Sequence, residues 1–264
     1  MKKRIHKVCF LLGCFLTCIG CYEPVNGCLN PEAENYSALA DEQCDDCCEF
    51  PDLSLRFIPL FEDTTFVQDD TIFDAFGNQF KLDQFEFFLE NVRLVSSDGE
   101  TKILDSLSYL DASGSVERLN DIIVFSFGKT SYNVGNFNAV KTFTAIRFDV
   151  GLNIMGLDFE SLPTGNPLIA LEDSLYIDDA FYSSQLDILT GTSFNDTMTV
   201  SCSWPIIALE LEFEEPVTSL IGQDLAVTIP FEMSKWIMGI NVILDTPEEI
   251  CAKLQSNVSL AFGL

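Results

Sequence analysis

The feature that most constrains the fold is the strict alternation of apolar and charged residues in the segment ALELEFEE, residues 208–215. Leu209, Leu211 and Phe213 are apolar, and glutamates occupy the positions between them. Successive side chains of a β-strand point to opposite faces, so this period of two predicts a strand with one buried and one solvated face. Such a strand belongs to an antiparallel sheet whose apolar face is covered by a second layer.

Similar patterns recur along the chain, separated by turn signals. Gly77-Asn78 lies between two short apolar runs in residues 71–82, which predicts a hairpin, and Asp98-Gly99 predicts a turn within residues 85–104. Further strands are expected in residues 53–57, 141–152, 208–215, 225–231 and 235–244. Short strands spaced in this way predict an all-β fold, an antiparallel β-sandwich.

One helix is predicted near the C-terminus. Thr246 is a suitable N-cap, Pro247 stands at the first helical position, and Glu249 completes a T-x-x-E capping box. The helix is expected over residues 247–256. The predicted fold class is therefore an antiparallel β-sandwich with one short C-terminal helix.

The N-terminus has the pattern of an export signal. A basic start is followed by thirteen apolar residues, 8–20, which are too few to span a bilayer as a helix. Gly20-Cys21 resembles the lipobox of bacterial lipoproteins, although Cys18 stands where that motif usually has Leu or Val. We expect residues 1–20 to be removed and Cys21 to be acylated, which would anchor the chain to the bacterial outer membrane, on its periplasmic or surface side. An ordinary secretory signal is the alternative, and both place the chain outside the cytoplasm.

Charge and histidine content exclude several functions. Without the four basic residues of 1–20, the chain carries 10 Lys and Arg against 41 Asp and Glu, a formal charge of −31. Such a surface repels nucleic acid, so no nucleic-acid partner is expected. The only histidine is His6, inside the signal. This excludes a histidine-based catalytic triad and histidine-ligated zinc or copper in the mature chain, and no catalytic residue is predicted.

Six cysteines remain after Cys21, and an even number outside the cytoplasm favours three disulfides. Cys202 and Cys251 are the only two in the main domain, residues 53–264, so we expect them to pair. The CDDC segment, 44–47, has the spacing of a zinc motif, which is the less favoured alternative. The disulfide candidates are Cys28, Cys44, Cys47, Cys48, Cys202 and Cys251.

Two groups of aspartates are candidate metal ligands, because carboxylate oxygens suit Ca²⁺. The first group lacks the ligand spacing of an EF-hand loop, so a disulfide-stapled spacer is the favoured interpretation there. The second group forms a charged turn, for which a solvated loop is favoured. The candidates are Asp41, Asp45 and Asp46 in the first group and Asp173, Asp178 and Asp179 in the second.

The segment that contains the first aspartates resembles a short cysteine-bounded module of exported Bacteroidota proteins. Asn30 departs from that pattern, where an aspartate is usual. The resemblance implies a disulfide-stapled, lipid-proximal spacer over residues 21–52. The matching residues are Gly27, Cys28, Pro31, Ala33, Asn35, Tyr36, Ala40, Asp41 and Cys44.

Residues 53–264 resemble the MbnP-like domain, a periplasmic β-rich family named for a copper-binding protein of methanobactin systems. The resemblance rests on an LxLxF strand at 53–57, on the segment 77–99 and on a middle segment at 146–153 that includes Gly151. Within these segments the matching residues are Phe85, Phe87, Phe88, Leu89, Asn91, Val92, Leu94, Ile146, Arg147, Phe148, Asp149 and Asn153. It implies a β-rich extracytoplasmic domain with a binding function.

The second half departs from the family. Asn166 stands where the family has a histidine, and Ile177 and Asp179 stand where it has tryptophans that relate to copper. The sequence therefore predicts a lipid-anchored, non-catalytic binding protein of unknown ligand, with an envelope protein as a candidate partner. The alternative is a metal-handling protein that holds copper or calcium through carboxylates or sulfurs in place of the histidine.

Overall fold

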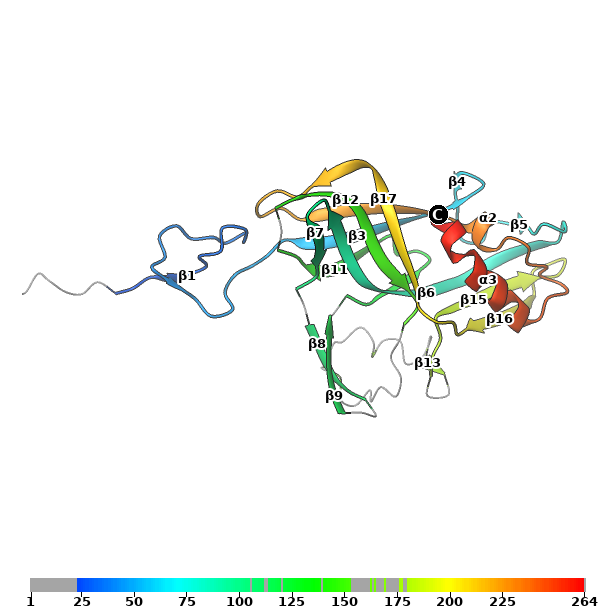
Figure 1. Ribbon diagram of the computed structural model, residues 1–264. Helices are drawn as coiled ribbons and strands as arrows, with labels where there is room; N and C mark the ends of the chain where they lie inside the picture. The colour runs from blue at the N-terminus through cyan, green and yellow to red at the C-terminus, as the bar shows by residue number, and fades with distance from the viewer. Residues whose placement is uncertain are drawn as a thin grey trace, which may run out of the picture.

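The computed structural model describes residues 23–104, 106–111, 114–119, 121–138, 140–152, 162, 164, 169, 176–177 and 180–263 (Figure 1). The predicted signal at 1–20, the lipidation residue Cys21, Asn166 and the aspartates 173, 178 and 179 lie outside these residues. Predictions about them stay predictions.

Two sheets form the body of the molecule. In the larger, eight-stranded sheet the order is β16-β15-β6-β12-β17, and β5, β7 and β10 also pair with β6. Its strands are β5 (Ile72–Phe73), β6 (Gln79–Ser96), β7 (Gly99–Lys102), β10 (Ile123–Ser126), β12 (Thr142–Val150), β15 (Ser184–Thr190), β16 (Asp196–Cys202) and β17 (Ile207–Thr218).

The smaller, four-stranded sheet has the order β11-β3-β18, and β4 pairs with β3. These strands are β3 (Asp52–Phe61), β4 (Thr64–Thr65), β11 (Ser131–Asn136) and β18 (Leu225–Glu232). The pairings within both sheets are antiparallel, except that β18 runs parallel to β3. The two remaining hairpins are β8 (Ser106–Asp111) with β9 (Gly114–Leu119) and β13 (Tyr176–Ile177) with β14 (Ala180–Phe181).

Aromatic side chains fill the space between the two sheets. Phe87 of the larger sheet lies 6.5 Å from Phe57 and 5.9 Å from Phe231 of the smaller one, measured between ring centroids. Phe125 stacks on Phe87 at 4.7 Å, and Trp236 lies 4.8 Å from Phe87. All five side chains are buried. The predicted β-sandwich is confirmed, with an aromatic core that crosses from one sheet to the other.

A β-bulge in β6 explains the asparagine at position 91. Phe148 on β12 faces both Asn91 and Val92, because the register shifts between Arg147 and Asp149. Asn91 has φ of +59°, which asparagine tolerates better than most residues, and its amide donates to Asp149 Oδ2 at 2.8 Å. The extra residue reverses the alternation, so that Phe85, Phe87 and Leu89 face the core before the bulge and Val92 and Leu94 face it after.

The segment 235–244, predicted as a strand, is instead a short helix followed by turns. Helix α2 (Met233–Trp236) begins after Glu232, whose side chain accepts a hydrogen bond from the Ser234 backbone. The prediction was wrong because the apolar residues are dense enough to fit either period, whereas the ones that are buried follow the helical period. Met233, Trp236, Ile237 and Ile240 are the buried residues at that spacing.

The two turns and the C-terminal helix are close to their predictions. The 71–82 hairpin forms, and the turn after β6 lies at Ser97-Asp98, one residue before the predicted pair. Helix α3 (Pro247–Ala261) starts with the predicted capping box between Thr246 and Glu249, and it ends five residues later than predicted. In the described part of the chain, no helix has the length and apolar character needed to cross a membrane.

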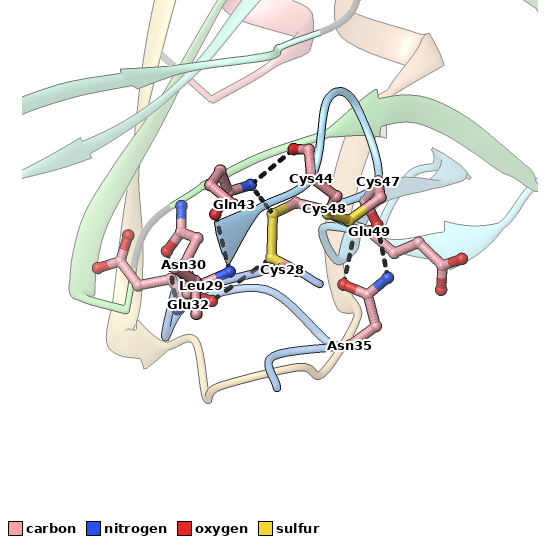
Figure 2. The surroundings of a disulfide bond; sticks show 10 residues. All are labelled: Cys28, Leu29, Asn30, Glu32, Asn35, Gln43, Cys44, Cys47, Cys48 and Glu49. Carbon is pink, nitrogen blue, oxygen red and sulfur yellow. Dashed lines mark hydrogen bonds between the residues drawn. A yellow bond between two sulfur atoms is a disulfide. The ribbon is translucent and has the colours of Figure 1, made fainter. Parts of the chain in front are cut away.

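Three disulfides involve all six candidate cysteines. Cys202–Cys251 forms as predicted and joins the end of β16 to α3, with the Cα atoms 5.2 Å apart. In the N-terminal module, residues 23–50, Cys28 pairs with Cys48 and Cys44 with Cys47 (Figure 2). A disulfide sulfur is not the thiolate that zinc requires, so the CDDC segment is a covalent staple. Three disulfides indicate an extracytoplasmic protein.

Hydrogen bonds complete the module and link it to the sandwich. Strand β1 (Asn26–Gly27) pairs in parallel with β2 (Glu42–Gln43). Asn35 donates to the carbonyl of Cys47 at 2.7 Å and accepts from the Glu49 backbone at 3.0 Å (Figure 2). Asn136 of β11 donates to the Phe50 carbonyl at 2.7 Å, at the point where the chain enters β3.

We expect replacement of both Cys202 and Cys251 by serine to lower the free energy of unfolding by about 4 kcal/mol, because the bond closes a loop of about 50 residues. The matched control replaces Cys44 and Cys47, which close a loop of about four residues, and it should cost about half as much or less. Chemical denaturation followed by tryptophan fluorescence measures both. An equal loss in the two variants would contradict this account.

Glu232 gives stability a defined pH dependence. Burial raises the pKa of its carboxyl, but hydrogen bonds from Ser234, from the Asp63 backbone and from the Glu62 backbone outweigh this and leave the pKa below its ordinary value. The stabilisation is therefore complete above pH of about 4.5 and is lost as the pH falls through the lower folded value. In urea titrations between pH 3 and 7, the difference between the wild type and Glu232→Gln should shrink on acidification. A constant difference would contradict the assignment.

Candidate binding cleft

One side of the sandwich is open. Strand β17 pairs only with β12 and strand β18 only with β3 among the described strands, so each forms an edge of its sheet. The two strands follow each other in the chain and are joined by residues 219–224, which carry it from one sheet to the other. The β17–β18 cleft is lined by residues of both edge strands.

The cleft has a volume of about 430 Å³, within the range of small-molecule sites. Most of its lining is apolar, and polar groups are found on only three of its residues. The lining residues are Ile146, Leu211, Phe213, Ile229, Pro230 and Phe262, together with Glu212, Glu214 and Thr228.

The floor of the cleft is buried and packs on the core, while its walls are partly open to solvent. Ile146, Ile229 and Phe262 are buried, and the Phe262 ring lies 5.7 Å from Phe231 and 5.5 Å from Phe148 in the core. Leu211 and Phe213 pack against the core from β17 but are only half-buried, because they belong to an edge strand beside the cleft. The site is thus preformed and presents apolar surface to an incoming ligand.

Two negatively charged residues lie at the opening of the cleft. Glu212 and Glu214 are exposed on β17, and no lysine or arginine in the described part of the chain forms an ion pair with either. Glu210, two residues before Glu212, forms an ion pair with Arg147. The hydrogen bond from the Arg147 guanidinium to Glu210 raises the pKa of the guanidinium above its ordinary value. The site therefore combines an apolar interior with two uncompensated carboxylates.

The structure does not gather the predicted metal ligands that it describes. Asp41, Asp45 and Asp46 are exposed in the N-terminal module, and Asp41 Oδ2 accepts a hydrogen bond from the Val25 backbone at 3.1 Å. Among the described residues, no three His, Cys, Asp or Glu side chains come together in a group that could hold a metal ion. Calcium or copper binding stays a prediction.

Sequence reasoning identified the inward side of β17 but missed the cleft. The alternation in 208–215 placed Leu211 and Phe213 on the buried face without showing that the sandwich is open beside them. Two prolines in the sequence could have indicated that these strands lie at sheet edges. Proline lacks the backbone N–H that a central strand must donate, and Pro216 and Pro230 stand in the two edge strands.

Comparisons with known proteins add one structural similarity. No family model matches the chain, and no curated protein matches it. Among solved structures, it is similar to MbnP from Methylosinus trichosporium, with 10% sequence identity, a TM-score of 0.44, and coverage of 71% of this chain and 78% of that chain. Similarity at this level carries no inference about a ligand, and membership of the MbnP-like family stays a prediction.

Proposed function

We propose that the chain is a lipid-anchored extracytoplasmic binding protein without catalytic activity, and that the β17–β18 cleft takes its ligand. The observation that carries the proposal is a preformed cleft of about 430 Å³ with an apolar lining and a buried aromatic floor. A site of this size and composition is typical of small-ligand binding.

The cleft favours a ligand with an apolar body and a positively charged end. An aliphatic or aromatic group would cover Leu211, Phe213 and Phe262 and remove their surface from water. A cationic group would lie at the mouth, near Glu212 and Glu214. An anionic ligand of the same shape would be repelled there and by the acidic surface as a whole.

The absence of catalysis is proposed from the chemistry of the side chains. The only histidine is His6, within the predicted signal, so the mature chain has no imidazole to act as general base or to hold a catalytic metal. Among the described residues that line the cleft there is no cysteine, serine or lysine; the one hydroxyl is that of Thr228, and the two glutamates are the only titratable groups. Binding is the function that this set of groups serves best.

The proposed anchor is a lipid on Cys21, immediately before the described part of the N-terminal module. The compact, disulfide-bonded module would then separate the membrane from the sandwich. Labelling with a clickable fatty acid tests this step independently of the cleft: Cys21→Ser should abolish incorporation, and retained incorporation would show that another residue carries the lipid.

We expect the domain, residues 22–264 with its disulfides intact, to bind the neutral fluorophore N-phenyl-1-naphthylamine saturably in the cleft. Decylamine, decanol and decanoate share one apolar chain and differ in charge, so their displacement of the fluorophore separates the two features of the site. Decylamine should compete best and decanoate worst. Replacing both Glu212 and Glu214 by glutamine should reduce the advantage of decylamine over decanol by about fivefold or less, as for exposed ion pairs.

Two variants that fill the cleft test its location. Leu211→Trp places a larger side chain on the β17 wall of the cleft. Thr228→Trp places one on β18, at an exposed position, so that the core is unchanged. Each should weaken fluorophore binding by about tenfold or more, which corresponds to about 1.4 kcal/mol. Leu39→Ser, at a side chain that is 85% exposed in the N-terminal module, is the control and should have no effect. The proposal fails if both filled variants, with unchanged melting temperatures, bind as the wild type does.

A further inference from the structure

A second surface of interest lies at the end of the molecule opposite the N-terminal module (Figure 1). Four large apolar side chains are exposed there on two neighbouring loops. Phe73 and Phe76, 59% and 62% exposed, belong to the β5–β6 hairpin. Ile243 and Leu244, 57% and 77% exposed, belong to the segment between α2 and α3. We call these four residues the tip patch.

Hydrogen bonds fasten the two loops to each other. Asp74 Oδ2 accepts from the Val242 backbone at 3.1 Å and from Asn78 Nδ2 at 2.8 Å. Asn78 Nδ2 also donates to Asn241 Oδ1 at 3.2 Å. The loops therefore present their apolar side chains from one connected scaffold.

The same network fixes the residues that carry the patch. The buried Asn241 accepts through Oδ1 from the Ile243 and Leu244 backbones, each at 3.1 Å. Asp245 accepts from the Asn241 backbone at 2.6 Å and forms an ion pair with Lys253 of α3. Because the backbone is held, these side chains would lose little freedom on binding, which favours an anchoring role.

Exposure of this kind requires an explanation. Loop tips accept polar residues without loss of stability, so four large exposed apolar side chains on two hydrogen-bonded loops of a folded domain point to an interaction site. The patch is separate from the β17–β18 cleft and shares no residue with it. The tip patch is therefore a candidate for a second binding surface.

The charges of the chain decide which occupant fits. Asp69 and Asp70 are exposed just before β5, Glu248 is exposed at the start of α3, and Lys253 is neutralised by Asp245. The formal net charge of the whole chain is −27. A second copy would bring the same negative surface against this one, and anionic lipid headgroups would be repelled.

We propose that the tip patch docks a partner protein that presents an apolar hollow rimmed by lysine or arginine. The aromatic and aliphatic tips would enter the hollow as anchors, and the basic rim would face the surrounding carboxylates. The N-terminal module at the opposite end leaves the patch at the far end of the molecule from a membrane-anchored N-terminus. The proposal does not depend on the ligand of the cleft.

The test uses a random 12-residue peptide library displayed on phage, panned against the full domain, residues 22–264. We expect enriched peptides that combine aromatic or aliphatic residues with lysine or arginine. Replacing Phe76 and Leu244 together by serine should weaken their binding by at least tenfold. Replacing the exposed Val25 and Leu39 of the N-terminal module by serine is the matched control and should leave the binding unchanged.

Two further variants separate how much peptide binding depends on the hydrogen-bonded link between the loops and how much it depends on charge. Asn78→Ser keeps all four apolar side chains but removes the amide that joins the loops, and it should weaken peptide binding by about threefold. Replacing both Asp69 and Asp70 by asparagine should reduce the salt sensitivity of peptide binding. All variants should retain the cleft binding of the wild type, which shows that they fold, and only Asn78→Ser should lower the melting temperature, because it loses hydrogen bonds to Asp74 and Asn241.

Other occupants are outcomes that would overturn the proposal. Binding to phosphatidylcholine vesicles that is lost in the Phe76 and Leu244 double variant would assign the patch to a lipid surface. A dimer in sedimentation that dissociates in the same variant would assign it to a second copy. Failure to enrich any patch-dependent peptide, or enrichment of acidic ones, would also reject a basic protein partner.

Discussion

The structure depends on the aromatic contact between the two sheets. Phe87 and Phe125 from the larger sheet meet Phe57 and Phe231 from the smaller one, and Trp236 closes the group from α2. These rings are large enough to fill the space between two sheets, and edge-to-face packing fixes their relative positions. The positions of the cleft floor and of both helices follow from this contact, because Phe262 and Trp236 pack on the same rings.

Covalent and hydrogen-bonded ties then determine what surrounds the core. The Cys202–Cys251 disulfide fastens α3 to β16, and the Asn91 bulge lets the long strand β6 change which residues face inward. At the far end, Asp74, Asn78 and Asn241 join two loops that are about 160 residues apart in the chain. Polar groups in these places hold irregular backbone in one arrangement, which strand pairing alone would not do.

The two proposed binding surfaces arise from different features of the same architecture. The cleft exists because β17 and β18 are edges of different sheets. The chain crosses from one edge to the other, but the two strands do not pair and the gap between the sheets stays open on that side. The tip patch exists because two loops at the end of the sandwich are anchored by buried residues such as Ile72 and Val242 and expose neighbouring apolar side chains. A strongly acidic surface surrounds both, so positive charge is the common property expected of their partners.

Much of the architecture was determined by the sequence itself. The period of two in residues 208–215, the capping box at Thr246 and the even cysteine count are local signals, and they predicted strands, a helix and disulfides that the structure contains. Segment 235–244 was mistaken for a strand because its apolar residues are dense enough to fit either period, and only the cap at Glu232 and packing on the core selected the helix.

The cleft and the tip patch were decided by tertiary structure alone. Whether an inward-facing Leu211 meets a neighbour or an opening depends on which strands form the sheet edges. Whether the loop of Phe76 lies beside the loop of Leu244 depends on hydrogen bonds between segments that are distant in the chain. Both are long-range relations between segments, which a local pattern of residues does not encode.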